Sequence, residues 1–205
     1  MSSTGQELEV KFMLPDLEQA AARLEALGAS LAQPRLHEMN LRFDTLTGDL
    51  SRQRQVLRLR QDSAARMTFK GPGQVQQGIQ QRQELEFTVD DFDTAQAFLE
   101  ALGYQVIWMY EKYRRVYALG QALVTLDEMP FGSFIEIEGP DAASIQAAAQ
   151  LLGLDWEARL LESYSALFEH LRGVLGFTFR DLSFANFAGM QVTPQALGGR
   201  LGLEP

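Results

Sequence analysis

ELEVKF, at Glu7 to Phe12, alternates charged and apolar side chains, and the same pattern returns twice further along the chain. The second copy is ELEFTV, at 84–89, and the third is FIEIEG, at 134–139. Successive side chains of a β-strand point to opposite faces, so each stretch predicts a strand with one charged face and one apolar face. Each copy also carries two glutamates spaced i, i+2, which therefore lie on the same face.

An amphipathic helix is predicted after each of these three strands. The helical stretches are PDLEQAAARLEALG (15–28), DDFDTAQAFLEALG (90–103) and PDAASIQAAAQLLG (140–153), each ending at a glycine. Pro15 suits an early helical position. We expect the large apolar residues to form the buried stripes, namely Leu24, Leu27, Phe98, Leu99, Leu102, Leu151 and Leu152.

Further strands are predicted between these units. They are NLRFD (40–44), VLRLR (56–60), RMTFK (66–70), YEKYRRVYAL (110–119) and ALVTLDEM (122–129), the last two joined by a hairpin turn at Gly120 and Gln121. GPGQVQQGIQQ (71–81) reads as a mobile loop, and a last helix is expected near 163–175. The pattern predicts an α+β fold, an eight-stranded antiparallel β-barrel or strongly curved sheet with flanking helices.

Composition excludes several classes of protein. The chain has no cysteine, which excludes disulfides, thiolate zinc sites and a cysteine nucleophile. Its only histidines, His37 and His170, are expected to be structural, which leaves oxygen ligands for any metal. A net charge of −9 argues against a nucleic-acid partner. MSSTGQELEV does not resemble a secretory signal, and no apolar run approaches a membrane span, so we expect a cytoplasmic protein without a membrane partner.

The charged face of the strands admits two interpretations. It is either the solvated face of an ordinary sheet or, because helices cover the apolar face, the inner face of a closed barrel. Buried ions are costly unless they are paired, so a charged lumen is best explained by a multiply charged ligand. Basic side chains would bind a polyphosphate, and the carboxylate pairs would hold Mg²⁺ or Mn²⁺.

The charged motifs, taken together, resemble those of the CYTH superfamily, the triphosphate tunnel metalloenzymes. The matching elements, in the family's order over residues 7–170, are ExExK (Glu7, Glu9, Lys11), LRLR (Arg58, Arg60), TFKGP (Lys70), RQELE (Arg82, Glu84, Glu86), EKYR (Lys112, Arg114), the strand of Asp127, and IEIEG (Glu136, Glu138). ExExK alone would be a weak signal, whereas all the elements in order make a strong one. The superfamily includes class IV adenylyl cyclases, thiamine triphosphatases and inorganic triphosphatases.

The resemblance implies a tunnel of eight antiparallel strands with a triphosphate lying along it. It places Glu7, Glu9 and Lys11 at the catalytic centre. The implied metal ligands are Glu7, Glu9, Glu136 and Glu138, with Asp127 and Glu86 as further candidates. The implied phosphate ligands are Lys11, Arg58, Arg60, Lys70, Arg82, Lys112 and Arg114. Residues 1–172 would form the tunnel domain, and the aromatic and Gly-rich tail, 173–205, would pack on the barrel or act as a lid with Arg180 at the tunnel mouth.

Three functions are compatible with such a tunnel. We expect a metal-dependent phosphohydrolase acting on inorganic triphosphate or a small organic triphosphate such as thiamine triphosphate, because no motif indicates an adenine pocket. The first alternative is an adenylyl cyclase that converts ATP to cyclic AMP and pyrophosphate. The second is a non-catalytic polyphosphate-binding or nucleotide-binding module, which would not need three acidic pairs. A homodimer is compatible with the pattern, and the residues leave the assembly open.

Overall fold

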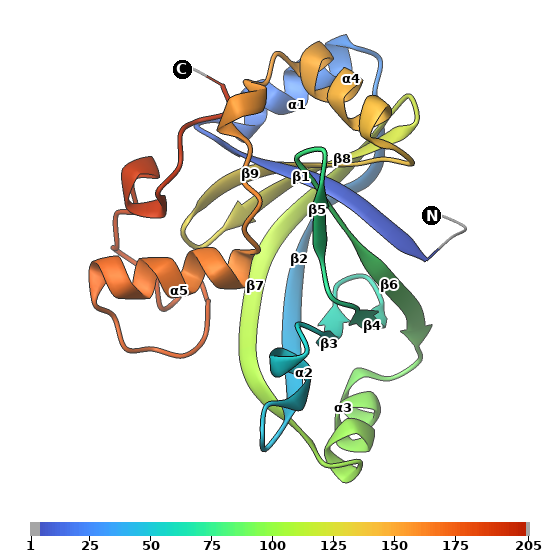
Figure 1. The fold of residues 1–205 in the computed structure, drawn as a ribbon, viewed down its shortest axis with the longest axis vertical. Helices are drawn as coiled ribbons and strands as arrows, with labels where there is room; N and C mark the ends of the chain where they lie inside the picture. The colour runs from blue at the N-terminus through green and yellow to red at the C-terminus, as the bar shows by residue number, and fades with distance from the viewer. Residues whose placement is uncertain (1–4, 204–205) are drawn as a thin grey trace.

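The computed structural model describes residues 5–203 (Figure 1). Its strands are β1 (Gln6–Leu14), β2 (Ser30–Thr45), β3 (Val56–Gln61), β4 (Ala65–Lys70), β5 (Gln74–Gln76), β6 (Ile79–Val89), β7 (Tyr104–Leu119), β8 (Ala122–Met129) and β9 (Gly132–Glu138). Its helices are α1 (Leu17–Ala26), α2 (Asp49–Arg52), α3 (Phe92–Ala101), α4 (Ala142–Leu152) and α5 (Tyr164–Leu175), with 3₁₀ turns η1 (Trp156–Ala158) and η2 (Pro194–Leu197). No helix among residues 5–203 combines the length and the apolar character needed to cross a lipid bilayer.

The strands close into a ring. Their order is β1-β9-β8-β7-β2-β3-β4-β6, every neighbouring pair is antiparallel, and β6 also pairs with β1. The predicted α+β fold with an antiparallel barrel is therefore confirmed. Strands β2 and β7 are the longest and extend well beyond the rest of the ring on one side (Figure 1).

The stretch predicted as a mobile loop, 71–81, instead forms a hairpin at its centre. Strand β5 pairs with the start of β6, with Gln74 opposite Gln81. Gln77 and Gly78 form the turn and both have positive φ, 53° and 73°. A two-residue turn with this backbone matches the twist of the flanking strands, which explains why a Gly-containing stretch without apolar alternation still pairs.

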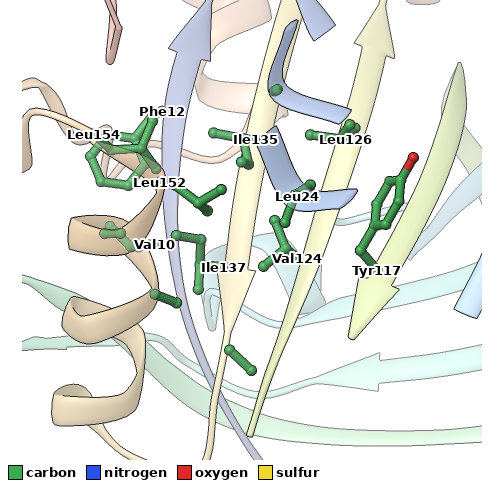
Figure 2. Packing of buried hydrophobic residues seen from close by; sticks show 14 of the residues in the cluster. Val10, Phe12, Leu24, Tyr117, Val124, Leu126, Ile135, Ile137, Leu152 and Leu154 are labelled. Carbon is green, nitrogen blue, oxygen red and sulfur yellow. The ribbon is translucent and has the colours of Figure 1, made fainter. Parts of the chain in front are cut away.

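Helices α1 and α4 lie side by side over the outer face of β1, β9 and β8 (Figure 1). Leu24 of α1 and Leu152 of α4 pack against apolar side chains of these strands, such as Val10 and Ile137 (Figure 2). Pro15 is not in the first helical turn, because Asp16 is the N-cap and its carboxylate accepts from the amides of the next residues.

Helix α3 covers the outer face of β3 and the neighbouring part of β2, where Leu99 packs with Leu59 and Phe43. Only some of the predicted stripe residues are buried. Those that remain exposed are Leu27, Phe98, Leu102 and Leu151. Adjacent helical residues point about 100° apart, so a short helix on a sheet buries only one of two neighbouring leucines or phenylalanines.

Helix α5 and the chain after it lie beside β7, β9 and β1 (Figure 1). The segment after α5 is tied to the barrel by backbone hydrogen bonds between Leu182 and β7, and between Gly202 and Met13. Phe168 of α5 and Phe187 are buried together in this layer. Arg180 pairs with the neighbouring Asp181 on the surface. The last two residues of the predicted tail, 204–205, lie outside the described residues.

Candidate functional site

The alternation of the strands places the predicted charged residues on the inner face of the ring. Their neighbours in sequence, such as Val10, Leu59 and Ile137, pack outward under the helices. Among the charged residues, several are almost completely buried: Glu7, Lys11, Arg58, Lys70, Lys112 and Asp127. The remaining predicted residues are half-buried except Glu86, which is more exposed. The lumen is thus lined by charged side chains rather than filled by a hydrophobic core.

Asp127 of β8 is fully buried and binds two cations of β7. Its carboxylate accepts from Lys112 Nζ at 2.8 Å and from Arg114 Nε at 2.6 Å. The hydroxyl of Tyr164, at the start of α5, donates to the same carboxylate at 2.8 Å. Lys11 Nζ lies 4.4 Å from the centre of the Tyr164 ring. Tyr164 therefore reaches from α5 into the lumen and is part of its charge network.

Glu136 of β9 joins this group from the other side. Lys11 Nζ lies 2.9 Å from Glu136 Oε1, and Arg114 Nη2 lies 2.6 Å from Glu136 Oε2. Burial disfavours the charged carboxylate, but Lys11, Arg114 and Lys112 together hold the pKa of Glu136 well below its usual range. Glu136 is therefore ionised and paired with these cations.

The opposite wall carries a second network, formed by β1, β4 and β6. Lys70 Nζ contacts both carboxylate oxygens of Glu7, at 2.7 and 2.8 Å. Arg82 Nε donates to Glu7 at 3.0 Å, and Lys70 also pairs with Glu84 at 2.9 Å. Glu7 is thus bound to two of the predicted phosphate ligands.

Arg58 and Arg60 of β3 complete this wall and both pair with Glu86, at 3.3 and 3.0 Å. Arg58 also donates to Thr68 at 3.1 Å and to the hydroxyl of Tyr110 at 3.3 Å. Burial disfavours the charged guanidinium, but the partner groups of Arg58 raise its pKa above the ordinary value. The carboxylate of Glu86 is thus paired with two arginines of β3.

Glu9 and Glu138 are the carboxylates that the cations leave least compensated. They lie directly opposite each other on β1 and β9, and Glu138 makes no ion pair within residues 5–203. Burial and the nearby carboxylates of Glu7, Glu84 and Glu9 raise the pKa of Glu138 to about 7. Burial, with Glu7 and Glu136, raises the pKa of Glu9 as well.

The under-compensated negative charge of Glu9 and Glu138 makes these two carboxylates candidate ligands of a divalent cation. Within residues 5–203, no three carboxylate or imidazole groups are already gathered as ligands. Glu9 and Glu138 nevertheless offer adjacent oxygen donors, and a bound cation would remove the repulsion that raises their pKa. The donor set therefore fits a hard divalent cation that binds mainly through oxygen, with Glu7 within reach on the same strand as Glu9.

Sequence reasoning missed the contribution of β2, whose inner face carries Glu38, Asn40 and Arg42. Burial disfavours the charged form of Glu38, but the cations Lys112, Arg114, Arg60 and Arg58 hold its pKa at about 2. Asn40 is fully buried, and neither polar atom of its side chain has a hydrogen-bond partner. The signal was available, because EMNLRF at 38–43 alternates in the same way as the other strands.

Both histidines lie outside the lumen. His37 contacts Glu111 at 2.9 Å on the outer side of β2 and β7, and His170 lies on α5. A cavity of about 450 Å³ beside α5 is lined by Arg159, His170 and Arg200, among others. Both arginines donate to backbone carbonyls there, so this cavity lacks the convergent charges of the ring interior.

Fold and site together define a tunnel-shaped antiparallel β-barrel whose lumen is lined by paired charges of both signs. The chain belongs to the CYTH domain family, whose model matches residues 5–162. The resemblance carried by the charged motifs is therefore confirmed. Enzymes of this family are in general metal-dependent.

Solved structures show the same fold. A candidate adenylate cyclase from Vibrio parahaemolyticus is 23% identical, with a TM-score of 0.71, over 81% of this chain and 99% of that one. A Pyrococcus horikoshii protein is 25% identical, with a TM-score of 0.65, over 77% of this chain and 96% of that one. A candidate adenylyl cyclase from Hippeastrum with a dominant triphosphatase activity is 19% identical, with a TM-score of 0.63, over 80% and 95%. No curated protein sequence matches the chain.

Proposed function

We propose that this protein is a divalent-metal-dependent triphosphatase that hydrolyses inorganic triphosphate or a small organic triphosphate inside the tunnel. The observation that carries the proposal is the arrangement of charges in the lumen. Cations line both walls, while Glu9 and Glu138 form a separate, under-compensated acidic pair. A divalent cation would supply the positive charge that this acidic pair lacks, and a triphosphate bound with it would offer oxygen acceptors to the cations of both walls.

The ion pairs of the ligand-free tunnel suggest how the chain's own residues bind substrate. Lys11, Arg114 and Lys112 are held by Glu136 and Asp127 at 2.6 to 2.9 Å. Phosphate oxygens can share or replace one carboxylate partner at each cation, which keeps the cation paired at the cost of weakening an internal ion pair. The cations then hold the chain of phosphates in line and stabilise negative charge that develops on the transferred group.

The carboxylates Glu9 and Glu138, with Glu7, would hold the divalent cation, Mg²⁺ or Mn²⁺. When bound, such a cation polarises the phosphate oxygens and neutralises charge in the transition state. Water attacks the terminal phosphorus, the bond from this phosphorus to the bridging oxygen breaks, and the diphosphate part of the substrate leaves with that oxygen. The terminal phosphoryl group becomes orthophosphate, and the proton that the attacking water loses passes to a phosphate oxygen or to solvent. Cations on opposite walls would fix the position of the phosphate chain, so that water can approach the terminal phosphorus in line with the oxygen that leaves.

Cyclisation of ATP is the competing reaction for the same tunnel. It requires the ribose 3′-hydroxyl to be held in line with the α-phosphorus, and hence contacts to the nucleoside. Tyr110 and Tyr164 reach the lumen, but the Tyr110 hydroxyl bonds with Arg58 and Tyr164 with Asp127. The dominant triphosphatase activity of the Hippeastrum protein also supports hydrolysis as the first choice.

The test is an incubation of inorganic triphosphate, thiamine triphosphate and ATP with Mg²⁺ or Mn²⁺, followed by separation of the products. We expect orthophosphate from inorganic triphosphate, little cyclic AMP from ATP, and no turnover in EDTA. Glu9→Gln keeps the shape of the side chain, removes its charge, and should abolish turnover. Glu128→Gln, on the outer face of β8, is the matched control and should retain full activity. Cyclic AMP and pyrophosphate as the main products would establish the cyclase instead.

A further inference from the structure

Arg42 differs from every other cation on the inner face of the described ring. The other lysines and arginines there each have a carboxylate within 4.0 Å: Lys11, Arg58, Arg60, Arg66, Lys70, Arg82, Lys112 and Arg114. Within residues 5–203, Arg42 has neither an ion pair nor a hydrogen bond. Its charge is therefore offset only through space, by Asp44 and Tyr110, and by no direct partner in the part of the chain that the structure describes.

A second unpartnered donor stands directly opposite Arg42. Trp108 of β7 is its cross-strand neighbour, and directly opposed side chains lie on the same face of a sheet. Both Arg42 Nε and the indole Nε1 of Trp108 are buried without a hydrogen-bond acceptor. Buried N–H groups are nearly always paired in folded proteins, so two neighbouring orphans indicate a missing acceptor.

Two further cations, Arg58 and Arg82, lie near these two donors. Arg58 lies directly opposite Arg42 on its other side, in β3. Burial, together with the charges of Arg58 and Arg82, lowers the pKa of Arg42 below its ordinary value, although Tyr110 and Asp44 act in the opposite direction. The Trp108 ring stacks on Tyr110 with 4.7 Å between ring centres, which fixes the direction of its N–H. The charges of Arg42, Arg58 and Arg82 favour a negatively charged acceptor between these two donors.

We propose that Arg42 and the indole N–H of Trp108 form an anion-binding station that takes an oxygen of the substrate's phosphate chain. This inference rests on the proposed function, and it adds two residues that none of the charged motifs contains. The station consists of donors only, which suits a phosphate oxygen and offers nothing to a hydroxyl or amine donor. Because Arg42 releases no carboxylate on binding, its contribution to affinity is not offset by a broken internal ion pair.

The station can be tested with imidotriphosphate and Mg²⁺, because N–H groups in place of the bridging oxygens resist hydrolysis. Isothermal titration calorimetry would compare wild type with Arg42→Met, Arg42→Lys and Trp108→Phe. Loss of a charge-assisted hydrogen bond should raise the Kd of Arg42→Met by roughly 10- to 100-fold. Arg42→Lys should recover part of the affinity, and Trp108→Phe, which keeps the ring without the N–H, should weaken binding several-fold. Arg115→Gln, on the outer face of β7 and paired with Glu18, should bind as wild type does.

The outcomes separate this inference from the proposed function. If wild type binds and Arg42→Met binds within about twofold of it, the station is wrong while the tunnel site stands. If wild type does not bind the triphosphate analogue, the proposed function fails and the station fails with it. Thermal unfolding without ligand is a second measurement. Arg42→Met should be at least as stable as wild type, because it removes a buried charge that has no direct ion pair; a marked loss of stability would show that Arg42 has a structural partner and would overturn the station.

Discussion

Among substitutions that remove one charge from the lumen, Asp127→Asn should destabilise the protein most. Asp127 is fully buried and is bound by Lys112, Arg114 and Tyr164 through hydrogen bonds of 2.6 to 2.8 Å. Asn keeps the volume but removes the negative charge and replaces one acceptor oxygen by a donor NH₂ group. Two buried cations of β7 then face each other with only Glu38 and Glu136 nearby.

The size of the effect follows from the burial of the pair. Breaking a buried ion pair by removing one partner costs about 3–5 kcal/mol. For a domain of this size, 1 kcal/mol moves the melting temperature by roughly 2–4 °C, so Asp127→Asn should lower it by on the order of 10 °C. Glu128, the next residue, pairs with Arg35 on the exposed side of β8. Glu128→Gln removes a surface pair and should cost at most about 1 kcal/mol.

The assay is thermal unfolding followed by far-UV circular dichroism, for wild type, Asp127→Asn and Glu128→Gln. A second arm adds tripolyphosphate without metal. Because the polyanion supplies the negative charge that the variant lacks, it should stabilise Asp127→Asn more than wild type. A melting temperature of Asp127→Asn equal to that of Glu128→Gln would refute the reasoning, since it would mean that the charges of the lumen are screened by solvent.

The remaining predictions concern pH, helix α5 and the metal. Burial and neighbouring carboxylates raise the pKa of Glu138 to about 7, so the folded chain keeps a proton that the unfolded chain loses from about pH 4.5 upward. The stability of the metal-free protein should therefore fall as pH rises from about 4.5 to 7, and Glu138→Gln should flatten this dependence in urea titrations at several pH values. Tyr164→Phe removes only the hydroxyl that donates to Asp127 and should cost about 1 kcal/mol, whereas Tyr164→Ala also empties the space against Phe131 and Phe134 and should cost roughly 3–5 kcal/mol by the same titration. Mn²⁺ binding, measured by calorimetry, should strengthen as pH rises through about 7, because the cation must displace the proton that Glu138 retains below that pH; binding that is independent of pH would place the metal elsewhere.

The barrel was predictable because strand alternation is a local property of the sequence. ELEVKF, VLRLR and FIEIEG each show which residues share a face. In the structure their charged faces line the inside of the ring, and their apolar faces lie outside. The full length of β2 was harder to predict from the sequence. Its first half, 30–37, contains Pro34, and its register against β7 shifts on both sides of Gln33. A proline and a bulge interrupt the period of two on which the prediction depends.

The charged motifs of the site were predictable from the sequence. The other residues that contact or neighbour these motifs in the lumen were not. Tyr164 reaches Asp127 from a helix that packs over the end of the ring, a contact that no local pattern encodes. Arg42 lay within a predicted strand, yet its lack of a partner depends on which strands become its neighbours. The exposed leucines and phenylalanines of the helices show the same limit, because the width of a buried stripe is set by the sheet beneath it. The roles of the motif residues in binding metal and phosphate stay predictions.

The closure of the ring through β1 has a consequence for how the chain folds. Strand β1 is made first, yet both of its partners come later: β6 near the middle of the sequence and β9 well beyond it. Contacts between such distant segments must overcome the entropy of closing long loops, which slows folding. Until β9 has left the ribosome, the apolar face of β1 has no complete set of neighbours and its charged face has no opposing wall. A chain that stops before residue 132 would therefore keep an open sheet with unpaired edges, the form most exposed to aggregation.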